Sequence, residues 1–271
     1  MSSPYAALSS DFYINARVNL KMDLPMRRDT VLPLFDRVRR QRPSMDKFRR
    51  YSNELALESR ATERSKGLEG ADLVGGGGGG EPGAYDWLAI RRTSIRSGSV
   101  NPDSDKHAHD LHGLILETCP YFLDVTPLDI ESVEVLFGFD LMAAGNHDAI
   151  VFGALLGDSP LGAIMQTGSG PGKAALPIDF QPLLGMSLTE QCDVQAIFEV
   201  KTRTSAAQVR SGEYREEPIS VYLIVRKHGP LEDVTQLPNI YHSLVARAEE
   251  LLDRRVVPNM IVPLREAIGA G

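Results

Sequence analysis

The order of the elements that the sequence predicts repeats once along the chain, and this repetition limits the folds open to it. In each half, hydrophobic periodicity predicts a strand, a helix, two further strands and a second helix. The first strand, residues 11–24, illustrates the pattern, because apolar side chains alternate there with Arg17, Asn19 and Lys21. Such alternation is typical of a strand with one face in water. We therefore expect an α+β fold in which antiparallel strands carry helices on one face.

Each half has its own set of predicted elements. The first half contains strands at 11–24, 48–60 and 85–99 and helices at 29–41 and 105–123. The second half contains strands at 130–142, 192–205 and 216–229 and helices at 146–156 and 238–255. Good N-cap residues precede two of the helices, Asn146 in one case and Ser104 or Asp105 in the other. The predicted repeats are residues 1–126 and 127–271, which together form one compact domain.

The helices that close the two halves carry the most specific correspondence. "DLHGL" at 110–114 pairs with "IYHSL" at 240–244, which makes His112 equivalent to His242. Each segment also follows a strand that ends in a cluster of arginines. We therefore predict an internal duplication, with both repeats in one continuous, curved sheet of pseudo-twofold symmetry.

Three further segments resemble a known family. They are "YINARVNL" (13–20), "VEVLFGFDL" (133–141) and the tail "VPNMIVPLREAI" (257–268). Together they are similar to a sporadically distributed bacterial family of uncharacterised function, and the duplicated layout resembles that of the TATA-box-binding protein. The resemblance implies a fold and no activity or site residue. The poly-glycine segment and "GDSPLGAIMQTGSGPGKAALP" (157–177) depart from it.

Two glycine-rich segments lack the pattern of a helix or a strand. Residues 65–83 contain six consecutive glycines, and we predict a flexible surface loop there. "TGSGPGKA" at 167–174 has the outline of a phosphate-binding loop, but that motif needs glycine at Thr167 and Ser or Thr at Ala174. We therefore predict a turn-rich surface loop without a phosphate site.

The composition, with 42% hydrophobic and 24% charged residues, is typical of a soluble globular protein. The N-terminus lacks the pattern of a signal peptide, and the longest apolar run, at 149–156, is too short to span a membrane. Cys119 and Cys192 are too few for a disulfide framework. These features predict a cytoplasmic protein that has no membrane partner.

Charge is distributed unevenly along the chain. Residues 1–98 hold 17 Lys and Arg against 12 Asp and Glu, whereas residues 99–271 hold 12 against 24. A basic part and an acidic part can each attract a partner of opposite charge, or attract each other between copies. The sequence therefore predicts self-association or a protein partner.

Three of the six histidines, His107, His109 and His112, lie within "KHAHDLHGL". Each residue of a helix advances about 100°, so His107 and His109 point nearly opposite ways and cannot share a metal ion. His109 and His112 can chelate together only with further ligands from elsewhere. Metallo-hydrolases with this spacing have aspartate before the last histidine, where this chain has Leu111. We predict solvated or hydrogen-bonded histidines, with a metal site at His109 and His112 as the alternative.

Basic residues of the predicted strands form the main candidate binding site. If the apolar residues of each strand face the helices, the basic side chains share the open face of the sheet. The candidates are Arg17, Lys21, Arg92, Arg96, Lys201, Arg203, Tyr222 and Arg226. Such a face suits an anion, a nucleic-acid backbone or an acidic protein segment. Glu134, Asp140 and Glu199 on the same face argue against nucleic acid.

No set of residues in the sequence predicts catalysis. The chain lacks a G-x-S-x-G elbow and a cysteine with a histidine partner. We therefore predict a non-catalytic binding or assembly protein without a cofactor, which self-associates through a sheet edge or a helix face. The alternatives are a metal-dependent hydrolase that uses the cluster from His107 to His112, and a nucleic-acid binder that uses the basic open face.

Overall fold

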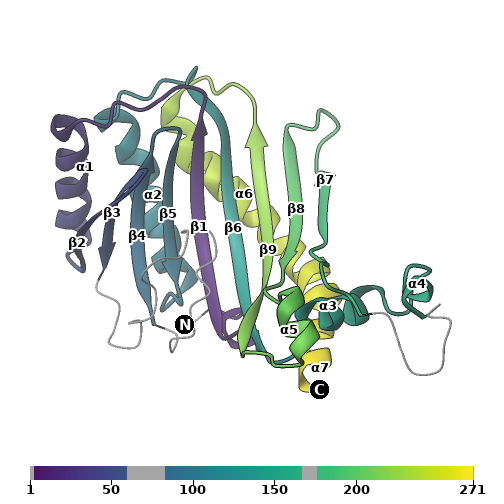
Figure 1. The fold of residues 1–271 in the computed structure, drawn as a ribbon. Helices are drawn as coiled ribbons and strands as arrows, with labels where there is room; N and C mark the ends of the chain where they lie inside the picture. Colours follow the sequence, from purple (N-terminus) through teal and green to yellow (C-terminus); the bar gives the residue numbers. More distant parts are fainter. Residues whose placement is uncertain (1–2, 60–82, 167–175, 271) are drawn as a thin grey trace.

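A single antiparallel sheet forms the body of the molecule (Figure 1). The structure is a computed structural model that describes residues 3–59, 83–166 and 176–270. Within these residues nine strands lie in the order β2-β3-β4-β5-β1-β6-β9-β8-β7. The strands are β1 (Asp11–Leu20), β2 (Met45–Tyr51), β3 (Glu54–Ser59), β4 (Tyr85–Arg91), β5 (Ser94–Val100), β6 (Ile130–Ala143), β7 (Leu183–Ser187), β8 (Val194–Lys201) and β9 (Glu217–His228). The predicted α+β class is confirmed.

The long helices cover one face of this sheet. They are α1 (Arg28–Gln41), α2 (Asp105–Phe122) and α6 (Leu237–Leu251). In Figure 1, α2 and α6 lie behind the strands and α1 lies at the left, beside β2. Helix α6 continues through the π-helical segment η4 (Leu252–Ile261) into α7 (Val262–Gly269). The shorter elements are η1 (Ala6–Leu8), α3 (His147–Leu156), α4 (Gly162–Gln166), α5 (Ala206–Ser211) and η3 (Val234–Gln236). Among the described helices, none combines the length and the apolar composition that crossing a bilayer requires.

Alternation in β1 places its apolar side chains against the helices. Phe12, Ile14 and Ala16 are buried on that side, whereas Arg17 is exposed on the other. Strand β6 pairs along the whole of β1, and the ring of Phe12 lies 5.3 Å from that of Phe139, centroid to centroid. Full burial of one large apolar side chain contributes about 1.5–3 kcal/mol. The pair β1 and β6 is therefore the centre of the core.

The predicted helix starts agree with the structure. The Ser104 side chain accepts a hydrogen bond from the backbone N–H of His107 at the start of α2. The Asn146 side chain accepts one from the backbone N–H of Ala149 at the start of α3. Each side chain satisfies a donor that the helix itself leaves unpaired, so local chemistry fixes where both helices begin.

Two segments that were predicted as single strands are hairpins. The described part of the first segment, residues 48–59, spans the end of β2, a turn at 52–53 and β3. Residues 85–99 span β4, a turn at 92–93 and β5. Two residues are enough to reverse the chain in a hairpin. Both turns lack glycine and proline, the strongest turn signals, so the sequence did not mark where the chain reverses.

Two predicted loops fall largely or wholly outside the described residues. They are the glycine-rich segment, of which only Gly83 is described, and the segment 167–174. The predictions of a flexible loop and of a turn-rich loop therefore stay predictions.

The strand order is symmetric about the central pair β1 and β6. Strands β5 and β9 flank this pair, β4 and β8 follow, and β3 and β7 come next, whereas β2 has no counterpart. The first half of the chain therefore forms one side of the sheet and the second half the other.

Candidate functional site

The face of the sheet opposite α1, α2 and α6, which we call the open face, carries several of the predicted binding residues. Arg17 on β1 lies between Arg96 on β5 and Glu134 on β6. Arg226 on β9 lies opposite Glu134 in turn. Because directly paired residues project to the same face, these four side chains form one row across the sheet. The structure thus brings three predicted cations together, with a carboxylate among them.

Arg96 is a buried cation. Its side chain is only 6% exposed, and one guanidinium nitrogen lies 3.5 Å from a carboxylate oxygen of Glu54. The guanidinium also lies 5.5 Å from the centre of the Trp87 ring. Aromatic and carboxylate partners of this kind compensate the cost of burying a charge. Arg96 therefore holds the open face together and is not presented to solvent.

Lys201, Arg203 and Tyr222 gather near the buried carboxylate of Asp140. Arg203 donates hydrogen bonds to the Pro218 carbonyl and, at 3.0 Å, to the Ser220 hydroxyl. Ser220 in turn donates to Asp140 at 2.5 Å. The Lys201 ammonium lies 5.5 Å from the centre of the Tyr222 ring and 3.5 Å from the Glu199 carboxylate. These cations therefore already have partners within the chain.

Asp140 titrates in an unusual range for an aspartate. Burial raises its pKa to about 6, although the hydrogen bond from Ser220 acts in the opposite direction. Burial also raises the pKa of Tyr13, whose ring packs 6.2 Å from that of Tyr222. Asp140 therefore changes its charge in mildly acidic solution, while Tyr13 stays neutral there.

The remaining candidates lie at the ends of strands or bind neighbours. Lys21 follows the last residue of β1, and Arg92 lies in the turn after β4, 3.6 Å from the Asp23 carboxylate. Arg226 donates two hydrogen bonds to the Gln195 side-chain oxygen, at 3.1 and 2.9 Å. Arg17 is exposed, and no described residue forms a hydrogen bond or ion pair with it. The open face is therefore a surface of mixed and mostly paired charge.

Aromatic residues on the open face were missed by the sequence analysis, apart from Tyr222. Trp87 lies over Gly98, and Tyr13 lies over Gly138. A glycine directly opposite an aromatic residue on the next strand is the signal that would have found them. Both rings are nearly buried, at 3% and 6% exposure, so they offer no free surface on which a base stacks.

The first of the three clustered histidines bonds to residues outside the cluster. His107 Nε2 lies 2.7 Å from a carboxylate oxygen of Asp86, and its Nδ1 lies 3.2 Å from a guanidinium nitrogen of Arg42. Because a guanidinium only donates, Nδ1 is the acceptor and Nε2 donates to Asp86. Both ring nitrogens are therefore engaged.

The other two histidines also have separate partners. His109 Nδ1 lies 2.8 Å from the Tyr241 hydroxyl. His112 Nε2 lies 3.1 Å from the Ile14 carbonyl, and its Nδ1 lies 2.7 Å from the Ser97 hydroxyl. A carbonyl only accepts, so Nε2 of His112 carries the proton. In the part of the chain that the structure describes, no three His, Cys, Asp or Glu side chains are grouped to hold a metal ion.

Ser97 and His112 share the hydrogen bond of a serine nucleophile and its base, but the pair is inaccessible. The two residues are 2% and 0% exposed. Burial lowers the pKa of His112 to about 3, which makes it a poor proton acceptor near neutral pH. The hydrogen bond between Ser97 and His112 is therefore structural.

His112 and His242, which the sequence pairs, differ in burial, because His242 is exposed. It is the neighbouring Tyr241 that contacts His112.

Strand β7 is the feature most open to a partner. It forms one edge of the sheet and pairs on its other side with β8. Pro182 and Leu188 bond to β8 through their backbone, so by alternation Leu183, Gly185 and Ser187 direct their N–H and C=O groups outward. No described residue bonds to these outward groups. An unpaired edge of this kind is a template for another strand.

The two edges of the sheet differ in how they are protected. Strand β7, "LLGMS", has no charged residue, and Leu183 and Leu184 are 64% and 63% exposed. Strand β2, "MDKFRRY", carries four charged residues within seven. Charged side chains are a common device against edge-to-edge pairing. The chain therefore protects β2 in this way and leaves β7 unprotected.

Comparison with protein-family models, with curated proteins and with solved structures finds no match for this chain. The resemblance to a sporadically distributed bacterial family therefore stays a prediction, and no activity or site is transferred from a relative.

Proposed function

We propose that this chain is a non-catalytic assembly protein that binds a second copy of itself through the free edge of β7. The observation that carries the proposal is the exposed edge strand without a charged residue. Burial of Leu183 and Leu184 removes apolar surface from water, and the outward backbone groups gain hydrogen bonds. Only a partner that supplies a strand obtains both gains together.

The sequence of β7 favours pairing with itself. In an antiparallel pair centred on Gly185, Leu183 of each copy lies opposite Ser187 of the other, and Leu184 lies opposite Met186. Such a contact uses the same patch on both copies and closes as a twofold dimer. Gly185 adds no side chain at the centre, so the two backbones approach without a clash. The sheets of the two copies then continue into one another.

Sedimentation velocity tests the proposal. The wild-type chain is expected to sediment as a dimer. Gly185→Pro removes an N–H that points outward and makes no bond to β8, so it blocks the pairing and leaves the monomer folded. The variant should sediment as a monomer with an unchanged circular dichroism spectrum. A wild-type chain that stays monomeric at high concentration overturns the proposal.

A matched pair of charge substitutions locates the interface. Leu184→Lys places a charge on the β7 edge and should dissociate the dimer. Phe48→Lys places the same charge at a side chain of β2 that is 50% exposed, and should leave the dimer intact. If both variants dissociate equally, the contact does not involve β7. A ladder of ever larger species would point instead to head-to-tail pairing of β7 with β2.

We also infer that the two halves of the chain are duplicated units. The symmetric strand order supports this inference, as does the contact between α2 and α6, where the rings of His112 and Tyr241 lie 5.5 Å apart. The hydrolase and nucleic-acid hypotheses have no comparable support, because the clustered histidines have separate partners and most cations of the open face are paired.

A further inference from the structure

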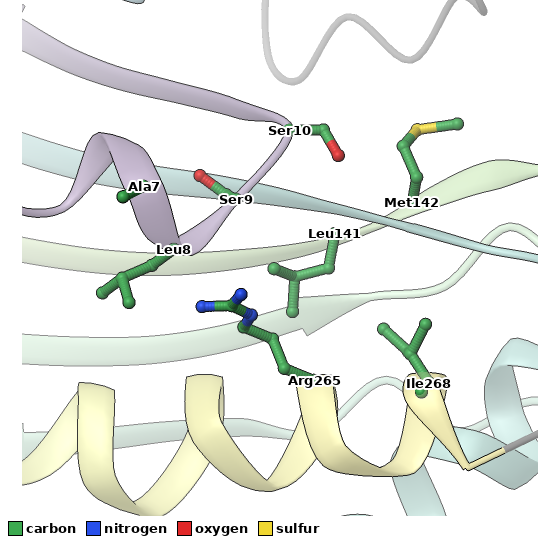
Figure 2. Close-up of a pocket in the computed structure, with 9 residues that line it drawn as sticks. Ala7, Leu8, Ser9, Ser10, Leu141, Met142, Arg265 and Ile268 are labelled. Carbon is green, nitrogen blue, oxygen red and sulfur yellow. The ribbon is translucent and has the colours of Figure 1, made fainter.

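A pocket of about 330 Å³ lies where the N-terminal segment meets α7 (Figure 2). Its walls come from η1 and the residues after it, from the end of β6, and from α7. Leu8, Leu141 and Ile268 provide apolar surface, and Ser9, Ser10 and Arg265 provide polar groups. A volume near 300 Å³ is at the small end of the range for ligand pockets, so a small molecule is the matching size.

Arg265 is the cation of this pocket. Figure 2 shows its side chain rising from α7 toward Leu8 and Leu141. Among the described residues none forms a hydrogen bond or an ion pair with its guanidinium. Arg254, on the helical segment just before, does have a carboxylate partner, Glu250, at 2.8 Å. Arg265 is therefore an exposed positive charge beside apolar walls, without a carboxylate partner among the described residues.

Ser9 supplies a second group that lacks a partner. Its hydroxyl oxygen is buried and makes no hydrogen bond. The segment is held in place, because the backbone N–H of Ser10 donates to the Asp140 carbonyl at 2.8 Å. A buried hydroxyl costs stability unless something bonds to it. Ser9 therefore leaves an unsatisfied polar group in the wall of the pocket.

We propose that this pocket binds a small monocarboxylate. The flat guanidinium of Arg265 matches the two oxygens of a carboxylate. Leu8, Leu141 and Ile268 contact the apolar part of the molecule. Among the described residues that line the pocket, Arg265 alone is charged, so the pocket balances a single negative charge and not the two of a phosphate dianion.

Calorimetric titration with benzoate as the probe tests this proposal. We expect saturable one-site binding to the wild-type chain, and at least a tenfold weaker affinity for Arg265→Met, which removes the charge but keeps an extended apolar side chain. Arg254→Met applies the same change to a paired arginine outside the pocket and should bind benzoate as the wild type does.

Three outcomes overturn the proposal. One is the absence of saturable benzoate binding to the wild-type chain. Another is equal affinity of the wild type and Arg265→Met, which would mean that benzoate binds elsewhere. The third is tighter binding of inorganic phosphate than of benzoate at neutral pH, which would assign the pocket to a different anion. Because Arg265 and Arg254 are exposed, both methionine variants are expected to fold.

Discussion

The ring of Tyr13 lies directly over Gly138 on the neighbouring strand, in the space that a larger side chain would need. A Cβ atom at Gly138 would lie 2.1 Å from a ring carbon of Tyr13. Tyr13 has little freedom to move away, since it is 6% exposed and packs against Tyr222. The absence of a side chain at Gly138 therefore fixes the position of the Tyr13 ring, close to Asp140.

Replacing this glycine is expected to destabilise the protein. Gly138→Ala forces the Tyr13 ring out of its site, and overpacking of this kind costs about 1–3 kcal/mol. The control is Gly113→Ala on α2, where an added Cβ meets nothing within 4 Å. That change should stabilise the protein by up to about 1 kcal/mol, the helix propensity of alanine over glycine. Urea denaturation measures both effects, and equal shifts would show that the contact with Tyr13 does not matter.

Asp140 is expected to reduce stability as the pH rises. Its pKa is raised from 3.8 to about 6 in the folded protein, so the folded state holds the proton more tightly than the unfolded chain does. The contribution of Asp140 is full below the unfolded pKa and is lost as pH rises through the folded one. The rise in the pKa of Asp140 corresponds to about 3 kcal/mol in the free energy of unfolding.

Asp140→Asn removes this titration while it keeps an acceptor for Ser220. Denaturation at about pH 4 and about pH 7 gives the free energy of unfolding of both proteins. Between these values the wild type should lose about 2 kcal/mol relative to the variant, because part of the linkage from the raised pKa is already lost at pH 4. A difference that stays constant with pH would contradict the assigned role of Asp140.

His112 has the opposite dependence. Its pKa is lowered from 6.5 to about 3, so the unfolded chain takes up a proton that the folded protein excludes. Its contribution to stability is full above pH 6.5 and is lost as the pH falls toward 3. His112→Gln keeps hydrogen-bonding groups and does not titrate. Between about pH 7 and pH 5 the wild type should lose about 2 kcal/mol relative to this variant, and equal losses would rule out this role for His112.

Two cations in one row should respond very differently to charge reversal. Arg17→Glu changes an exposed side chain without a described partner, so the free energy of unfolding should change by less than about 0.5 kcal/mol. Arg96→Glu places a charge beside Glu54 in a buried site and should cost at least about 3–5 kcal/mol. Chemical denaturation of both variants makes the comparison. A large effect at Arg17 would show that it has a partner in solution.

The open face could be anticipated in part from the sequence. Alternation placed Arg17, Arg96, Tyr222 and Arg226 on strands, and the structure has them on one face. The sequence did not predict which of these side chains are buried or paired. Glu54, for example, neutralises Arg96 and belongs to a hairpin that the pattern did not resolve. Arg92 was expected on a strand, but it lies in the turn of another hairpin.

The sequence by itself determined the local elements of this protein, because periodicity and capping depend on residues near one another in the chain. The apolar stripe of α2 and the alternation of β1 are examples, since each side chain needs only its neighbours to set its direction. Only the tertiary structure decided which strands lie at the edges and which charges are buried. Those properties depend on pairing between distant segments, such as β7 with β8 alone, and on the position of Arg96 against Trp87. The exposed edge of β7 and the pocket at Arg265 result from such long-range contacts, so no local sequence pattern predicted them.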